Sequence, residues 1–271
     1  MSRIAACMSD LKSRQRKALV PYVTAGDPQP EVTVPLLHAM VQAGADMLEI
    51  GVPFSDPMAD GPVIQAACER ALRHHVTLHQ VLDMVREFRR QDDATPVILM
   101  GYLNPIEVWG YTDFAQAAAA AGVDGVLTVD MPPEEADGLA SAFRESQVDT
   151  IFLLAPTSDA ERMRKVGEMA SGFLYYVSFK GVTGANRLDV QAVATKLEEL
   201  RKFTQLPVGV GFGIRDGASA AQVAQVADAV VVGSVLVSKV AELADQPAAI
   251  PAQVAAIVGK LRAAMDATGA S

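Results

Sequence analysis

The chain has 271 residues, a hydrophobic fraction of 50% and a formal net charge of -9 at pH 7. A nucleic-acid binder needs a basic face that displaces counterions from phosphates, so this charge argues against DNA or RNA as a partner. The longest basic run, Arg14-Gln15-Arg16-Lys17, is interpreted as the end of a solvated helix.

The sequence shows no recognisable signal for export or membrane insertion, so the cytoplasm is the expected location. No stretch approaches the ~20 uninterrupted apolar residues of a membrane span, and no apolar signal core opens the chain, so no membrane partner is expected. Cys7 and Cys68 each lack a CxxC partner. They are expected to stay reduced, as is usual for thiols in the cytosol.

Short apolar runs rich in Val, Ile and Leu recur along the chain, each followed by a segment with helical character. The runs do not alternate cleanly with polar residues, which is typical of parallel strands buried on both faces. The eight expected strands are Ala18–Thr24, Met47–Gly51, Val97–Tyr102, Gly125–Val129, Thr150–Leu154, Leu174–Ser178, Val208–Gly211 and Ala229–Val232.

The segments between these strands are amphipathic or alanine-rich; Val32, Leu36 and Met40 form one such stripe. A helix is expected before the first strand, and a closing helix at Val254–Met265. Eight unbroken repeats predict an α/β fold in which residues 1–271 form one domain, a (β/α)8 TIM barrel with an extra helix at its N-terminus. A doubly wound open sheet is the alternative, but the GxGxxG motif that often follows its first strand is absent.

An acidic cluster follows the second expected strand, and barrel active sites lie at the C-terminal ends of strands. Glu49 interrupts an apolar run and shares its parity with Met47 and Gly51, so we expect it to point into the barrel mouth. Burial there would raise the pKa of the carboxyl towards an acid–base range. The loop that follows holds Asp56 and Asp60 among prolines and glycines, which makes a catalytic pair of carboxylates plausible.

Glycines gather at the ends of the last three strands. They lie in Lys180-Gly181-Val182-Thr183-Gly184, Gly209-Val210-Gly211-Phe212-Gly213 and Gly233-Ser234. A phosphate site after strands 7 and 8, completed by a helix N-terminus, recurs in this fold. The three clusters therefore predict a phosphate held by backbone amides, which also suits an acidic protein without a basic patch.

Longer motifs carry a resemblance to a known family. They are Pro21-Tyr22-Val23-Thr24-Ala25-Gly26-Asp27-Pro28, Leu48-Glu49-Ile50-Gly51-Val52-Pro53-Phe54-Ser55-Asp56-Pro57-Met58-Ala59-Asp60-Gly61, Tyr175-Tyr176-Val177-Ser178, Gly181-Val182-Thr183-Gly184 and Val208-Gly209-Val210-Gly211-Phe212-Gly213-Ile214. With these motifs the chain resembles the tryptophan synthase alpha subunit from about the first strand through the eighth.

The resemblance implies cleavage of indole-3-glycerol phosphate to indole and glyceraldehyde 3-phosphate. By the family pattern, Glu49 is the general acid and base, Asp60 accepts a hydrogen bond from the indole N–H, and Tyr175 lines the indole slot and assists proton transfer. The implied apolar walls are Tyr22, Met100, Leu127 and Leu153. The implied phosphate-binding residues are Thr183, Gly184, Gly211, Gly213, Gly233 and Ser234.

The resemblance also implies an α2β2 complex in which indole passes through a tunnel to a beta subunit that carries pyridoxal phosphate. The alpha chain itself is expected to need no cofactor and no metal. The residues implied to face the partner are Pro53, Asp56, Tyr102, Asn104 and Pro105.

Other functions remain as alternatives. A Schiff-base aldolase would use Lys180 as its amine; however, an inward Tyr175 places Val177 and Phe179 inward too, and Lys180 on the other face. A partner-activating subunit without its own chemistry is disfavoured by the intact Glu49 and Asp60. A metal site at His74, His75 and His79 lacks an acidic or cysteine ligand, so an exposed helix face is the preferred interpretation.

Overall fold

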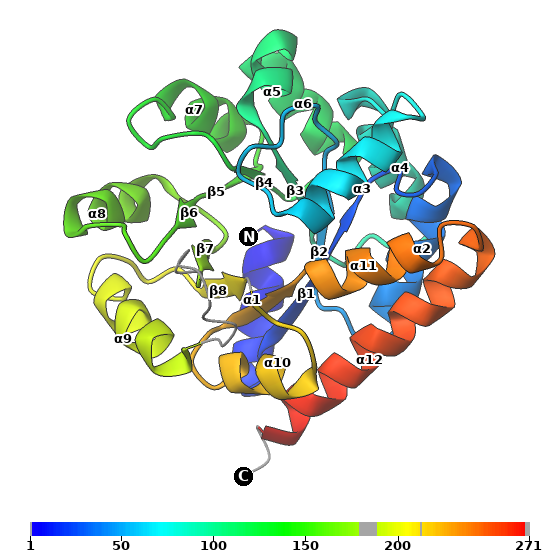
Figure 1. Ribbon diagram of the computed structural model, residues 1–271. Helices are drawn as coiled ribbons and strands as arrows, with labels where there is room; N and C mark the ends of the chain where they lie inside the picture. Colours follow the sequence, from blue (N-terminus) through cyan, green and yellow to red (C-terminus); the bar gives the residue numbers. More distant parts are fainter. Residues whose placement is uncertain (1, 179–188, 212, 269–271) are drawn as a thin grey trace.

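The computed structural model describes residues 2–178, 189–211 and 213–268. The strands in these ranges are β1 (Ala18–Thr24), β2 (Leu48–Gly51), β3 (Val97–Gly101), β4 (Gly125–Thr128), β5 (Asp149–Ile151), β6 (Leu153–Leu154), β7 (Leu174–Val177), β8 (Val208–Gly211) and β9 (Ala229–Val232). They form one parallel sheet in the order β5-β4-β3-β2-β1-β9-β8-β7-β6. Because only Phe152 separates β5 from β6, the two ends of this order meet and the sheet curves into a barrel (Figure 1).

Helices surround the barrel on the outside, as expected when crossover connections cover a parallel sheet (Figure 1). They are α2 (Pro30–Gln42), α3 (Pro62–Leu72), α4 (Leu78–Arg89), α5 (Leu103–Trp109), α6 (Tyr111–Ala121), α7 (Asp137–Glu145), α8 (Ala160–Met169), α9 (Val190–Leu200), α10 (Gly217–Ala224), α11 (Ser234–Glu242) and α12 (Ile250–Thr268), with a short 3₁₀ helix at Pro247–Ala249. The remaining described helix, α1 (Arg3–Ser13), lies across one end of the barrel.

The predicted TIM barrel is confirmed. Four predicted strands are one residue shorter in the structure, which excludes Met47, Tyr102, Val129 and Ser178, and the fifth strand differs more. The predicted strand Thr150–Leu154 is interrupted at Phe152, so the structure has β5 and β6 in its place. The reason is a change of partner: β5 pairs with β4 as far as Ile151, and β6 pairs with β7 from Leu153 onward. Ladder hydrogen bonds on both sides are therefore satisfied by a short strand that passes from one neighbour to the other.

Strand parity divides the apolar core into two layers. Side chains that point outward, such as Leu19 and Val23 of β1, pack against the surrounding helices, and the α2 stripe of Val32, Leu36 and Met40 is buried there as predicted. Side chains of the opposite parity fill the barrel interior, for example Val20 and Met47.

The predicted N-terminal helix closes the lower end of the barrel. Ile4, Met8 and Leu11 of α1 lie in one cluster with the inward side chains of the strands, and each is buried. Figure 1 shows α1 lying behind the ring of strands. The barrel interior is thus covered at its N-terminal end, and it is open at its C-terminal end.

Within the described ranges, one helical stretch, Pro247–Ala267, is long and apolar enough to cross a membrane by length and composition. Its buried residues, including Val254, Val258 and Leu261, pack against the barrel, and α12 contacts α2 and α10 along its length. Arg262 on the same helix is buried and pairs with Asp46 at 3.0 Å. This stretch is therefore the closing helix of the barrel, longer than the predicted Val254–Met265.

Candidate active site

Glu49 lies on β2 with its side chain inside the barrel, as the parity argument predicted. Its neighbours Leu48 and Ile50 belong to the outer core, and Met47 belongs to the inner core. The residue is only 2% exposed, and Oε2 has no hydrogen-bond partner among the described residues. Burial and then the charge of Asp60 raise the pKa of Glu49 to about 8, so the carboxyl is mostly protonated at neutral pH.

Asp60 lies in the loop between β2 and α3, which brings it to the same cavity as Glu49. The loop is held by main-chain bonds: the Asp60 amide donates to the Pro57 carbonyl at 3.0 Å, and Gln65 Nε2 donates to the Asp60 carbonyl at 2.8 Å. Burial raises the pKa of Asp60 above its ordinary value. The predicted pair of carboxylates is therefore brought together, each in surroundings that favour its neutral form.

Tyr102 holds the side chain of Asp60 in place. Its hydroxyl donates to Asp60 Oδ2 at 2.9 Å and accepts from the Ala59 amide at 3.0 Å. The Tyr102 ring stacks on Phe54 with centroids 5.1 Å apart, so the loop is clamped at both of its ends. The hydrogen bond from Tyr102 acts against burial and lowers the pKa of Asp60, because it stabilises the ionised form.

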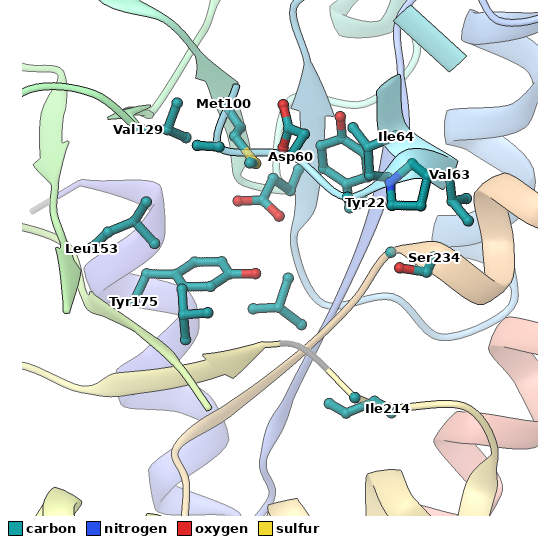
Figure 2. Close-up of a pocket in the computed structure, with 18 residues that line it drawn as sticks. Tyr22, Asp60, Val63, Ile64, Met100, Val129, Leu153, Tyr175, Ile214 and Ser234 are labelled. Carbon is teal, nitrogen blue, oxygen red and sulfur yellow. The ribbon is translucent and has the colours of Figure 1, made fainter. Parts of the chain in front are cut away.

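Two tyrosines face the acids from opposite sides of the cavity, the buried Tyr22 on β1 and the partly buried Tyr175 on β7 (Figure 2). Each hydroxyl occupies space that a neighbouring glycine leaves free: a Cβ atom on Gly51 would collide with Tyr22 Oη, and one on Gly211 with Tyr175 Oη. Burial raises the pKa of both phenols well above 10, and the nearby Glu49 raises both further. The phenols therefore stay neutral and can donate hydrogen bonds.

The cavity between these groups has a volume of about 330 Å³ and lies at the C-terminal ends of the strands. Most of its surface is apolar. The apolar side chains that line it are Val63, Ile64, Met100, Val129, Leu153, Val177, Ile214 and Val231. A flat apolar molecule that enters it meets a buried, protonated acid that no cation of the described residues compensates, a setting suited to proton transfer.

The far end of the cavity is formed by main chain and a helix terminus. Gly213 and Ile214 follow β8, and Gly233 and Ser234 follow β9. Ser234 is the first residue of α11, whose first-turn N–H groups donate no hydrogen bond to a capping side chain. Gly213 has φ +80°, a conformation that glycine adopts freely. Within the described part of the chain no lysine or arginine lines the cavity, so an anion here is held by amides and the helix dipole.

Most of the predicted pocket residues lie around this cavity, and a few do not. Leu127 is fully buried one layer deeper in the barrel interior, and Val129, two residues later with the same parity, takes its place at the surface of the cavity. Gly211 acts indirectly, because it leaves room for Tyr175. Thr183 and Gly184 lie outside the described residues, as does Lys180 of the alternative aldolase.

Sequence reasoning missed several lining residues. Val129 and Val231 share the inward parity of Leu127 and Gly233, so strand parity alone would have found them. Val177 was expected to point inward with Tyr175 but was not predicted as a lining residue. Val63 and Ile64 come from the first turn of α3, and no sequence signal marks them as part of the cavity.

The residues predicted to face a partner differ in exposure. Asp56 and Asn104 are exposed, Pro105 is half-buried, and Pro53 is buried. Tyr102 is 4% exposed and contacts the loop between β2 and α3 instead of solvent. Among the described residues, the large apolar side chains that are most exposed are Met58 at 85% in the loop between β2 and α3 and Val108 at 81% on α5, close in sequence to these positions.

No group of three or more His, Cys, Asp or Glu side chains that could hold a metal is found in residues 2–178, 189–211 and 213–268. Of the three histidines considered as ligands, His79 stacks on Trp109 with ring centroids 3.6 Å apart.

Comparison with known proteins gives a consistent result. The family model described as tryptophan synthase alpha chain matches residues 8–266. The tryptophan synthase alpha chain of Nitrosococcus oceani is 62% identical over 268 residues, 99% of each chain, and that of Thioalkalivibrio sulfidiphilus is 63% identical over 98% of this chain and all of the other. Among solved structures, tryptophan synthase subunit alpha from Legionella pneumophila superposes with a TM-score of 0.92 at 46% identity, covering 98% of this chain and 99% of that one. A chain of Mycobacterium tuberculosis tryptophan synthase gives 0.88 at 37% identity, covering 97% and 98%.

Proposed function

Since the chain belongs to the tryptophan synthase alpha chain family, and is therefore a lyase that cleaves indole-3-glycerol phosphate, we propose that the cleavage takes place in the cavity between Glu49 and Ser234. The observation that carries this assignment is a buried acid at one end of an apolar cavity and a helix N-terminus at the other. These features match the reacting carbon and the phosphate of the substrate, with the flat indole ring between apolar walls.

The reaction is a retro-aldol cleavage that needs two proton transfers. Carbon 3 of the indole gains a proton, and the hydroxyl on the adjacent side-chain carbon loses one. The bond between the two carbons then breaks, its electron pair returns to the indole ring, and the side chain leaves as glyceraldehyde 3-phosphate. No net proton is consumed, so one group that donates first and accepts afterwards is sufficient.

We assign both transfers to Glu49. With its pKa raised to about 8, Glu49 is protonated in the resting enzyme and can donate to carbon 3. The carboxylate formed in this way is a stronger base than an ordinary glutamate, because burial penalises its charge. It can therefore take the hydroxyl proton and return to its starting state.

We assign electrostatic stabilisation to Asp60. Protonation of carbon 3 places positive charge on the ring nitrogen, and a carboxylate that accepts the N–H hydrogen bond stabilises that charge. Asp60 must be ionised for this role, and the hydrogen bond that Tyr102 donates to Oδ2 favours the ionised form. Tyr102 is thus a positioning residue for Asp60.

The remaining lining residues bind the substrate. Tyr175, whose hydroxyl points into the cavity, is the residue placed to help with proton transfer to or from Glu49 (Figure 2). The proposed walls of the indole slot are Tyr22, Met100 and Leu153, with Leu127 beneath them and Val129 added from the structure.

The phosphate is assigned to the far end of the cavity. Gly213, Gly233 and Ser234 offer backbone N–H groups and one hydroxyl there. Gly211, also predicted to bind the phosphate, does not line the cavity and instead leaves room for Tyr175. Thr183 and Gly184 remain proposed phosphate-binding residues outside the described part of the chain.

Family membership implies a beta-subunit partner. We propose an α2β2 tetramer in the cytoplasm, with this chain as a single-domain subunit that needs no cofactor and pyridoxal phosphate in the beta subunit that receives the indole. The proposed contact surface includes Asp56, Asn104 and Pro105, and the exposed Met58 and Val108 extend it. Pro53 and Tyr102 are buried, and Tyr102 acts through the loop, whose Ala59 amide donates to its hydroxyl.

Indole release from indole-3-glycerol phosphate by wild type and Glu49→Gln, with and without a tryptophan synthase beta subunit, tests the proposal. The wild type is expected to release indole faster with the partner, and Glu49→Gln is expected to be inactive in both conditions. A variant that keeps most of the activity would overturn the assignment of Glu49. A wild type that is inactive even with the partner would overturn the assignment of the reaction.

A further inference from the structure

A second cavity, with a volume of about 470 Å³, lies at the opposite end of the barrel. Three of its lining residues, Lys17, Pro207 and Asp228, each directly precede a strand, β1, β8 and β9 respectively. Because the strands are parallel, this end is the N-terminal face, away from the active site. The other wall is the C-terminal part of α1. We call this cavity the basal cleft.

The basal cleft carries a local excess of positive charge in a protein whose net charge is -9. Four of its lining residues are cationic, and Asp228 is the single carboxylate among them. Arg16 is neutralised outside the cleft by Asp266 at 2.9 Å. Lys17 and Arg201 share Asp228 at 3.9 and 3.5 Å.

Lys12 completes this set on the exposed side of α1, and no carboxylate of the described residues lies within 4.0 Å of its ammonium group. The cleft therefore holds about two positive charges more than its own carboxylate balances. An entering anion would meet cations without displacing a strong ion pair.

The inner surface of the cleft is apolar. Met8 and Leu11 of α1 are 7% and 2% exposed, and Leu206 and Pro207 are half-buried opposite them. Small-molecule sites typically combine such apolar walls with a few charged groups that fix one end of the ligand. The run Arg14-Gln15-Arg16-Lys17 is thus only in part a solvated helix end, because three of its residues line this cleft.

We propose that the basal cleft is a binding site for a small organic anion, a phosphate or carboxylate group attached to a compact apolar body. The anionic group lies between Lys12, Lys17 and Arg201, and the apolar body packs against Met8 and Leu11. The competing explanation is that these charges only fasten α1 to the barrel, since the N-terminal face of such barrels usually serves stability. Arg16 suits that explanation, with its bonds to Asp266 and Asp46. Lys12 does not, because it has no partner to fasten.

Methionine-methyl NMR of the full chain tests the proposal, because Met8 lines the basal cleft and Met100 lines the active site. The chain is labelled with [¹³C-methyl]methionine, and the Met8 signal is assigned with Met8→Leu. Phenyl phosphate and benzoate are titrated separately to distinguish a phosphate from a carboxylate ligand, with phenol as the uncharged control. The Met8 signal is expected to shift and saturate with at least one of the anions and to remain unmoved with phenol.

The double variant Lys12→Gln/Arg201→Gln separates the two sites. The affinity reported by Met8 is expected to fall by about tenfold or more, since each 1.4 kcal/mol of lost binding energy is a factor of ten. Any shift of Met100 on phenyl phosphate addition is expected to be unchanged. Lys202→Gln is the matched control: it removes one exposed positive charge next to Arg201 that does not line the cleft, and it should leave the Met8 titration unaltered.

Two results would overturn the proposal. One is a Met8 signal that does not move with either anion up to millimolar concentrations. The other is a Met8 titration that is the same in the wild type and the double variant, which would show that the cations of the cleft take no part in binding.

Discussion

On the β2–β3 side of the active-site cavity, two carboxylates, Glu49 and Asp60, lie without a cationic partner in the described part of the chain, and burial raises the pKa of each. On the β8–β9 side, Gly213, Gly233 and Ser234 form a surface of main chain and helix terminus that carries no formal charge. The acid side thus holds groups whose charge the protein disfavours. The phosphate side offers partial charges that are fixed in place before the substrate arrives.

This difference shows how an acidic protein can bind a dianionic substrate beside two carboxylates. A protonated Glu49 removes one negative charge from the cavity at neutral pH. In the proposed binding mode the anion is held at the far end by amides, which need no counter-ion and do not stabilise the ionised form of Glu49 as a lysine would. Perturbing the acid side should therefore change the rate of the chemical step, and perturbing the phosphate side should mainly change binding.

The largest expected effect is that of Asp60→Asn. The variant cannot balance the charge that develops on the indole ring, and the cleavage rate is expected to fall by a factor of about 10² to 10³. Steady-state indole release gives kcat and KM separately. A rise in KM with an unchanged kcat would contradict the assignment of the acid side to the chemical step, because Asp60 would then act in substrate binding.

Glu49→Gln, which is expected to abolish activity, should make the folded protein more stable. The folded-state pKa of Glu49, about 8, lies above its unfolded value of 4.5, so stability is fully present below pH 4.5 and is lost as the pH rises towards 8. Glu49→Gln removes this loss and should raise the free energy of unfolding by about 3 kcal/mol at pH 7 while changing it little at pH 4.5. Urea unfolding at the two pH values measures the difference. A variant that is less stable than the wild type at pH 7 would show that the burial of Glu49 carries no cost.

Tyr102→Phe is expected to have an intermediate effect, a fall in kcat of about tenfold with a smaller change in KM, since one charge-assisted hydrogen bond to Asp60 is lost. The pKa of Asp60 should rise further, because the bond from Tyr102 lowers it. The acid limb of the pH–rate profile would then move to higher pH. Tyr111→Phe, which removes a phenol hydroxyl outside the cavity, is the control; an unmoved acid limb in Tyr102→Phe would show that Tyr102 only packs.

The smallest effect is expected on the phosphate side. Ser234→Ala leaves the backbone amides and the α11 dipole in place, so KM should rise by about three- to tenfold with kcat nearly unchanged. Ser141→Ala on α7, far from the cavity, is the matched control. A fall in kcat as large as that of Asp60→Asn would remove the distinction between the two sides.

Features that follow from residue spacing along a single strand could be predicted from the sequence. Strand parity was sufficient to place Glu49 inside the barrel, and the glycines at strand ends indicated the phosphate side. The interruption at Phe152 was not predictable, because it depends on which strands β5 and β6 pair with. Leu127 was expected at the wall of the cavity, and its depth became known only when the barrel interior was seen in layers.

Contacts between segments that are distant in the chain could not be predicted from the sequence for a similar reason. Tyr102 was expected at a partner surface, and its hydrogen bond to Asp60 joins residues 42 positions apart. The basal cleft combines residues from α1, from the segment before β8 and from the residue before β9. No periodicity or motif connects these segments, since only the closed barrel brings them together.

The central claim, that cleavage depends on a buried and protonated Glu49 beside an ionised Asp60, is tested most directly by the pH dependence of kcat/KM for indole release in the wild type and in Asp60→Asn. The wild type is expected to lose activity on the alkaline side with an apparent pKa near 8, the value of Glu49. In Asp60→Asn the residual activity should decline at a lower pH, because the charge of Asp60 contributes to raising the pKa of Glu49. An alkaline limb that is absent, or that stays at the same pH in Asp60→Asn, would contradict the account.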